Sequence, residues 1–214
     1  MYVKSRMTAN PYTIAFNAPI NEVIELMHEK NLKRVPVVDD EKVVGIITSS
    51  DLEKVSPTKA TTLSIYEINY LLSKTLVRDA MTKEVITISP DALLEEAAVL
   101  MRSYRISTLA VVKENKLVGI ITESDIFDAF IDILGFRDIG SRITVEANDV
   151  PGALADIGNI FSSFDANITH IADYRGSGGK SDVVIRTNAL NTDDIEEELK
   201  KRGYLVLNVI KNQG

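Results

Sequence analysis

The chain contains the same segment twice, and this repeat restricts its fold more than any other feature. Residues 45–51 read GIITSSD and residues 119–125, 74 positions later, read GIITESD. The same offset holds without a gap back to Met7 and Met81. A gapless repeat predicts one structural unit used twice, with the two copies packed against each other. We therefore expect a cleft that equivalent polar groups line twice.

Each repeat is predicted to fold as a strand, a helix, a hairpin and a second helix. In the first repeat, Ile20, Val23 and Met27 have the spacing of a helix with one buried face. The β-branched runs at 35–38 and 43–48 flank a polar turn, as in a hairpin. The residues expected in short opening strands are Thr13, Ile14, Thr87 and Ile88. The residues expected as helix N-caps are Asn17 and Asp91.

Residues 57–77 break the symmetry between the repeats. Ser64 and Glu67 have the spacing of a capping box, with Leu63 and Ile68 placed as a hydrophobic staple. This pattern predicts a connecting helix that serves packing or contact with a second copy.

A different pattern begins at about residue 140. Strand and helix signals follow in the order βαββαβ, which is the ferredoxin-like arrangement. The turn at 148–152 leads into a helix, for which Leu154, Ile157, Phe161 and Phe164 are expected to face inward. The run GGKS at 178–181 resembles the end of a phosphate-binding P-loop, but it joins two strands and is predicted to be a hairpin.

The predicted fold is therefore α+β, with two βαββα units followed by a ferredoxin-like domain. The expected boundaries are 1–56 for the first repeat, 57–77 for the connecting helix, 78–136 for the second repeat and 140–214 for the C-terminal domain.

Composition excludes several functional classes. The net charge of −7 argues against nucleic-acid binding, and the absence of cysteine excludes disulfides and thiolate metal sites. No signal peptide or membrane-spanning run is visible, so we expect a cytoplasmic protein. The two histidines, His28 and His170, belong to different predicted domains, and no catalytic motif is present. We expect no enzyme activity, no catalytic cofactor and no metal.

The repeated Thr-x-x-Asp has two interpretations. It is a variant of the helix capping box, which would make both residues structural. Alternatively, an ionised Asp can accept hydrogen bonds from the two cis hydroxyls of a ribose, while a Thr hydroxyl binds phosphate. Because both copies keep Thr and Asp, the sequence favours a nucleotide site.

On these residues, the region 4–134 resembles a tandem pair of CBS domains, a Bateman module. The resemblance implies a regulatory adenosine ligand in each cleft, such as AMP, ADP, ATP or S-adenosylmethionine. It also implies a set of nucleotide-binding residues, which are Thr48, Asp51, Thr122, Asp125, Thr13, Ile14, Thr87, Ile88, Arg34, Pro36, Thr108 and Ala110. Because the Lys33-Arg34 pair is cationic and its equivalent Ser107-Thr108 is neutral, we expect unequal affinity for phosphorylated ligands.

The C-terminal region, at about 141–212, resembles an ACT domain. In that family the loop after the first strand and the start of the second strand form an amino-acid site between two copies. The residues that this resemblance implies are Asp149, Gly152, Leu154, Asn167 and Ile168. The alternative is an ordinary Pro-Gly turn in a domain that serves only in pairing.

The combination resembles the acetoin-utilisation, AcuB-type family of bacterial proteins. It implies a non-catalytic homodimer that senses adenine nucleotides, and amino acids through the ACT domain, in acetoin or amino-acid metabolism. No nucleic-acid or membrane partner is expected. The alternative is a scaffold that regulates a partner enzyme by contact, without any ligand.

Overall fold

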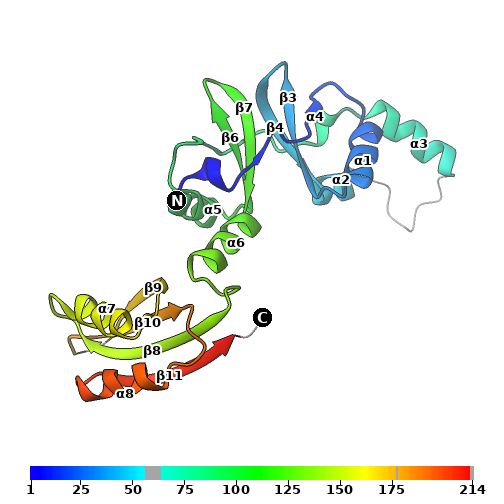
Figure 1. The fold of residues 1–214 in the computed structure, drawn as a ribbon. Coiled ribbons are helices and arrows are strands. Elements are labelled where there is room, and N and C mark those ends of the chain that lie inside the picture. Colours follow the sequence, from blue (N-terminus) through cyan, green and yellow to red (C-terminus); the bar gives the residue numbers. More distant parts are fainter. Residues whose placement is uncertain (56–63, 177, 213–214) are drawn as a thin grey trace. The chain divides into compact units, whose positions relative to one another are not determined.

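The computed structural model describes residues 1–55, 64–176 and 178–212, and it confirms the α+β class (Figure 1). The chain divides into two compact units, Met1–Ile126 and Phe127–Gly214. The first unit holds most of both repeats, and the second holds the C-terminal domain.

The two repeats have the predicted order of elements. The first contains β2 (Ile14–Ala15), α1 (Ile20–Glu29), β3 (Arg34–Asp39), β4 (Lys42–Thr48) and α2 (Ser49–Val55). The second contains β5 (Thr87–Ile88), α5 (Leu94–Tyr104), β6 (Thr108–Lys113), β7 (Lys116–Thr122) and α6 (Glu123–Ile133). In both, the opening strand is parallel to the first strand of an antiparallel hairpin.

Each repeat is preceded by a lead-in segment, residues 7–12 for the first repeat and residues 81–86 for the second. Each lead-in segment joins the sheet of the other repeat. Strand β1 (Thr8–Ala9), which follows the short helix η1 (Val3–Ser5), pairs with β7, and Thr8 lies opposite Ile120. The equivalent Thr82 forms a β-bridge with Ile46 of the first repeat. This exchange places residues of both repeats at the end of each hairpin.

Close packing between the repeats explains the glycine in the repeated motif. A Cβ atom at Gly45 would lie 2.3 Å from Sδ of Met81, and one at Gly119 would lie 2.5 Å from Sδ of Met7. The group that approaches each glycine is a methionine thioether from the other repeat's lead-in segment.

The buried face of α1 was predicted correctly, whereas the N-caps of α1 and α5 were not. Helix α1 buries Ile20, Val23 and Met27 in the core of the first repeat, as expected. Its N-cap is Pro19 and that of α5 is Leu93, so the expected caps Asn17 and Asp91 are wrong. At α5 the backbone N–H of Leu93 donates to Glu96 Oε1 (3.2 Å), and Asp91 instead pairs with Lys4 (2.7 Å).

The connecting region contains α3 (Ile65–Lys74) and α4 (Val77–Ala80), of which only the first was predicted. Ser64 and Glu67 form the expected capping box. The expected staple includes Leu63, which lies outside the described residues. Helix α3 packs against α1, and Leu72 contacts the first repeat's core.

The second unit has the predicted ferredoxin-like fold. Its elements are β8 (Gly140–Asn148), α7 (Ala153–Ser163), β9 (Ile168–Arg175), β10 (Lys180–Thr187), α8 (Asp193–Lys201) and β11 (Leu205–Asn212). The antiparallel sheet has the order β11-β8-β10-β9. The GGKS run lies at the turn between β9 and β10, as predicted.

Two residues at the ends of α7 differ from the prediction. Ile157 and Phe161 are buried, but Leu154 is 47% exposed and Phe164 is 42% exposed, and Ile160 completes the buried face. Leu154 stands in the first turn of the helix and Phe164 follows its last residue. The ends of a helix extend past the part that the sheet covers, so periodicity alone does not bury them.

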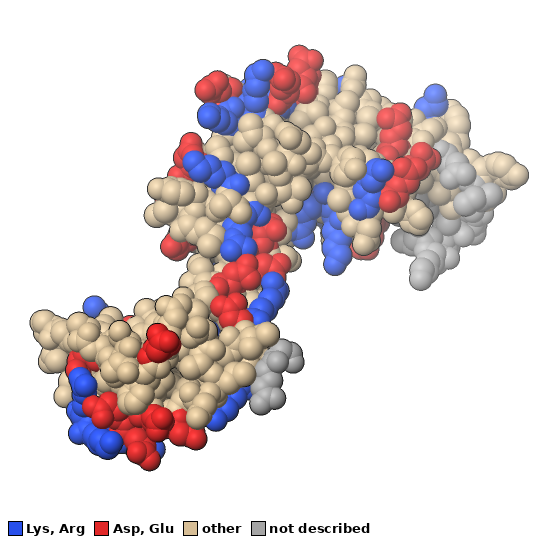
Figure 2. Space-filling model, viewed as in Figure 1, with Lys and Arg blue, Asp and Glu red and all other residues tan. Residues whose placement is uncertain are grey.

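The surface carries mixed charge. On the face shown in Figure 2, red and blue atoms lie close together, as over α8, where acidic residues begin the helix and Lys200 and Lys201 end it. In the described part of the chain, no helix has the length and apolar character to cross a membrane. No group of three or more potential metal-ligating side chains occurs among those residues.

Candidate functional site

Two cavities of about 410 and 380 Å³ lie in the first unit, and the 74-residue offset relates their linings. We call the one with Thr48 the first cleft and the one with Thr122 the second cleft. The equivalent residues, with the first cleft's residue named first, are Ile46 and Ile120, Thr48 and Thr122, Ser50 and Ser124, Thr82 and Thr8, Glu84 and Asn10, Val85 and Pro11, Ile86 and Tyr12, Arg105 and Asn31, and Ile106 and Leu32.

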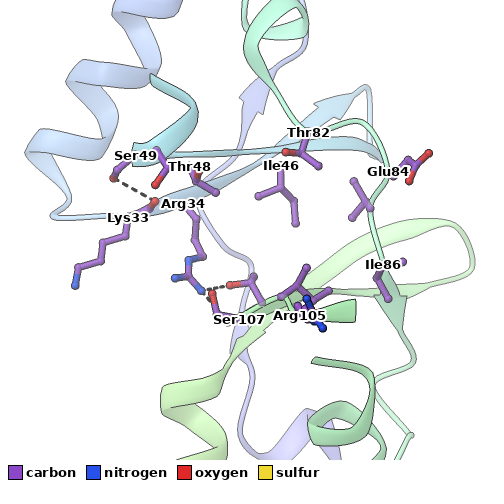
Figure 3. Close-up of a pocket in the computed structure, with 14 residues that line it drawn as sticks. Lys33, Arg34, Ile46, Thr48, Ser49, Thr82, Glu84, Ile86, Arg105 and Ser107 are labelled. Carbon is purple, nitrogen blue, oxygen red and sulfur yellow. Dashed lines mark hydrogen bonds between the residues drawn. The ribbon is translucent and has the colours of Figure 1, made fainter. Parts of the chain in front are cut away.

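Each cleft is built from both repeats. In the first cleft, Ile46 and Thr48 come from β4, whereas the segments 82–86 and 105–108 come from the second repeat (Figure 3). The second cleft reverses these roles, with Thr122 at the end of β7. The exchange of lead-in segments produces this arrangement, because it places 8–12 and 82–86 beside the other repeat's hairpin.

The repeated Thr and Asp bond to each other in both copies, and Thr48 and Asp51 form a complete capping box. The backbone N–H and the hydroxyl of Thr48 both donate to Asp51 Oδ2, at 3.1 and 2.7 Å, and the N–H of Asp51 donates to Thr48 Oγ1 at 3.3 Å. At Thr122 the corresponding distances to Asp125 Oδ2 are 2.7 and 2.8 Å. The geometry is therefore that of the capping alternative.

The two carboxylates differ in their second oxygen. Asp51 Oδ1 accepts a hydrogen bond from Lys54 (3.1 Å), whereas Asp125 Oδ1 has no hydrogen-bond partner among the described residues. Burial acts to raise the pKa of Asp51, but the hydrogen bonds from Thr48 and Lys54 outweigh it and lower that pKa below its ordinary value. Asp51 is only 7% exposed and is held as an ionised cap.

The clefts contain part of the predicted nucleotide-binding set. Thr48, Thr122, Arg34, Pro36 and Thr108 line them. The predicted residues that do not line either cleft are Asp51, Asp125, Thr13, Ile14, Thr87, Ile88 and Ala110. The role of the two aspartates as ribose ligands stays a prediction, and a ribose would have to reach carboxylates that already cap helices.

Sequence reasoning missed the lead-in segments and Arg105. The offset that relates Met7 to Met81 also relates Thr8 to Thr82. That signal was present, but only the exchange between sheets shows that these residues enter the clefts.

Cations line both clefts. Lys33 and Arg34 contribute to each, and Arg105 contributes to the first. Arg105 has φ of 54° and its equivalent Asn31 has φ of 51°. Asn adopts this left-handed conformation readily, whereas Arg does so at a cost in conformational energy.

The predicted amino-acid-binding residues of the second unit lie in two places. Asp149, Gly152 and Leu154 line a cavity of about 300 Å³, together with Asp173 and Ser181. Asn167 and Ile168 line a different cavity of about 350 Å³. One chain does not bring the two groups together, and the expected site between two copies stays a prediction.

A third cavity of that unit, about 420 Å³, contains side chains whose charges pair with one another. Asp156 accepts hydrogen bonds from Tyr204 (2.9 Å) and Arg202 (2.6 Å), which lower its pKa. Lys180 pairs with Glu146 across the same cavity. This network ties α7 to the region that connects α8 to β11.

Comparison with known families matches these parts of the chain. The CBS domain model matches residues 3–57 and 77–132, and the ACT domain model matches residues 141–203. Inosine-5'-monophosphate dehydrogenase of Aquifex aeolicus is 32% identical over 72% of this chain, which spans only 31% of that enzyme. The CBS domain-containing protein YhcV of Bacillus subtilis is 29% identical over 66% of this chain and 92% of its own length.

Solved structures are similar to part of the chain. The AcuB protein of Vibrio cholerae, named for acetoin utilization, has a TM-score of 0.53 and 30% identity, and the match covers 64% of this chain and 95% of that one. The CBS pair of MJ0100, in complex with 5'-methylthioadenosine and S-adenosyl-L-methionine, has a TM-score of 0.50, 32% identity, and coverage of 61% and 95%. CBSX2 in complex with AMP has a TM-score of 0.51, 29% identity, and coverage of 62% and 97%. The chain belongs to the CBS domain family, and it carries a tandem CBS pair followed by an ACT domain.

Proposed function

We propose that the chain is a non-catalytic regulatory protein that binds an adenosine compound in the two clefts between its CBS repeats. One observation carries this proposal: two cavities of similar size have equivalent linings, and each draws on both repeats. The neighbours that hold AMP, 5'-methylthioadenosine and S-adenosyl-L-methionine support an adenosine ligand.

The linings suit the parts of such a ligand. Ile46, Val85 and Ile86 give the first cleft an apolar wall for a purine. Hydroxyl groups of Thr48 and Thr82 can bind ribose or phosphate oxygens, and Arg34 and Arg105 can neutralise a phosphate. The volumes lie within the range of small-molecule sites, about 300–1,000 Å³.

The direct test is thermal unfolding of the full chain with AMP, ADP, ATP, S-adenosylmethionine and, as a control, GMP. A ligand at about 100 times its dissociation constant should add about 2.7 kcal/mol of stability. A binding isotherm with Thr48→Val and Thr122→Val variants then locates the site. If none of the adenosine compounds changes the unfolding temperature, the sensor function is rejected.

Amino-acid binding by the ACT domain is a second proposed activity. Leu154 is 47% exposed in the first helical turn beside the cavity that Asp149 and Gly152 line, as a residue that meets a ligand or a second copy would be. Two chains paired through this domain would supply Asn167 from the partner. Sedimentation of the full chain with and without each of the twenty amino acids tests both amino-acid binding and the pairing of two chains. A ligand bound between two copies should strengthen the homodimer. An Asn167→Ala variant that responds unchanged would exclude this site.

The proposed role in metabolism rests on a structural neighbour. We infer regulation of a partner enzyme in acetoin or amino-acid metabolism, because the neighbours include AcuB. A ligand must favour one conformation over another for such a signal to pass. The alternative is a scaffold that needs no ligand. A variant changed at Thr48, Asp51, Thr122 and Asp125 that still binds and regulates the partner would favour the scaffold.

A further inference from the structure

Arg34 differs in position from every other cation among the described residues of the CBS pair. It is the first residue of β3, it lines both clefts, and it is half-buried. Its Nη1 donates to the backbone oxygen of Ser107 at 2.7 Å and to the hydroxyl of Thr108. Figure 3 shows these bonds crossing from the first repeat to the second.

Arg34 and Thr108 are equivalent residues, 74 positions apart. A residue can touch its own equivalent only where the axis that relates the two repeats passes between them. The boundary between the clefts therefore runs through this contact. One of the two equivalent positions carries a cation and the other carries a hydroxyl.

The guanidinium retains free donors. Arginine has five N–H groups, and the two bonds described above use only Nη1. Among the described residues, neither Nη2 nor Nε has a hydrogen-bond partner, and no carboxylate lies within ion-pair distance. A guanidinium without an acidic partner in a cleft wall is suited to bind an anion such as a phosphate.

The neighbouring cations do not duplicate this role. Lys33 also lines both clefts, but it is exposed, and its side chain points away from Arg34 and Ser107 in Figure 3. Arg105 belongs to the first cleft, and its equivalent in the second is the neutral Asn31.

Given the proposed adenosine binding, we propose that the two clefts share Arg34 as one anion-binding group, so that a phosphorylated ligand in one cleft weakens phosphate binding in the other. A guanidinium that turns toward a phosphate in one cleft is withdrawn from the other. The coupling requires a phosphate, and adenosine, which has none, should not show it.

The test compares cleft-blocked variants by titration calorimetry with AMP. Thr82→Trp fills the first cleft and Thr8→Trp fills the second, since each threonine is exposed and lines one cleft only. The unmodified chain should bind AMP in two steps, one for each cleft. With the first cleft blocked, the second should bind AMP about 10- to 100-fold more tightly than the weaker of those two steps, because Arg34 is then available to it. Adding Arg34→Gln should abolish that gain, whereas Arg78→Gln, which removes the same charge at an exposed position outside both clefts, should leave it.

The outcomes separate this inference from the function on which it rests. If the unblocked cleft binds AMP only as tightly as the weaker step of the unmodified chain, the clefts are independent and the sharing of Arg34 is rejected, while adenosine binding stands. If neither AMP nor adenosine binds the unmodified chain, both proposals fail. Thermal unfolding checks that each variant is folded. If Arg34→Gln does not fold, the same Thr82→Trp comparison made with adenosine remains, since a gain in affinity for adenosine as large as that for AMP would reject a shared phosphate-binding group.

Discussion

At the residue scale, Gly45 and Gly119 show how the absence of one side chain allows the repeats to pack. The methionine sulfur atoms of the opposite lead-in segments occupy the space that a Cβ would need. The backbone is tolerant of other residues at these positions, so the constraint is one of volume and not of conformation.

Gly45→Ala should lower the free energy of unfolding by about 1–3 kcal/mol, because a methyl group must displace the Met81 thioether. Urea unfolding measures the change. The double variant Gly45→Ala/Met81→Ala should lose less stability than the sum of the two single losses, because the shortened side chain at 81 leaves room for the methyl group at 45. Strict additivity of the two substitutions would show that this contact is not the cause.

Asp51 should make stability depend on pH. Its lowered pKa means that the folded chain holds the carboxylate ionised more firmly than the unfolded chain does. The stabilisation is therefore present above the unfolded pKa, about 3.9, and is lost as the pH falls through the folded value. Asp51→Asn should cost about 1–2 kcal/mol at pH 7 and progressively less below about pH 4.

Urea unfolding at several pH values measures this difference, with the exposed turn variant Asp40→Asn as the control. A cost for Asp51→Asn that stays constant from pH 7 to pH 3 would contradict the ionised cap.

At the element scale, the exchange of lead-in segments joins the repeats. Residues 1–9 bond to the second repeat: Val3 N–H donates to Ala92 O (3.0 Å), and β1 extends the sheet at β7. The periodicity predicted the helices and hairpins of both repeats because their apolar spacing is local. It did not predict this pairing, since a two-residue strand has no periodic signal and its partner lies over a hundred residues away.

Deletion of residues 1–9 should destabilise the second repeat by at least about 2 kcal/mol, because it exposes the surface that buried Val3 covers and removes the strand beside β7. Amide hydrogen exchange should show the greatest loss of protection in β7. Lys4→Ala is the matched control, since its ion pair with Asp91 is exposed and should change stability little. Exchange in β7 that matches the intact chain would contradict the role of β1.

At the scale of the whole molecule, the two units have separate cores. One includes Ile20, Val23 and Val35, and the other includes Ile143, Ile157 and Phe161. Units with independent cores can unfold separately, and a ligand stabilises only the unit that binds it.

We therefore expect two transitions in a calorimetric scan of the full chain. AMP should raise the temperature of one transition, and Thr48→Val should reduce that shift without moving the other. A single transition that AMP shifts as a whole would show instead that the CBS pair and the ACT domain unfold together.

The sequence alone determined the fold class, the two repeats, the hairpins and the buried face of α1, because apolar spacing and turn residues act within a few positions. It also marked Thr48, Asp51 and their equivalents and favoured ribose binding over capping for them, and that role stays a prediction. Tertiary structure decided which residues line the clefts, since the exchange of lead-in segments brings in 8–12 and 82–86, and it placed Arg34 against its own equivalent. Such contacts depend on how the two copies pack together, and no local pattern in the chain records that packing.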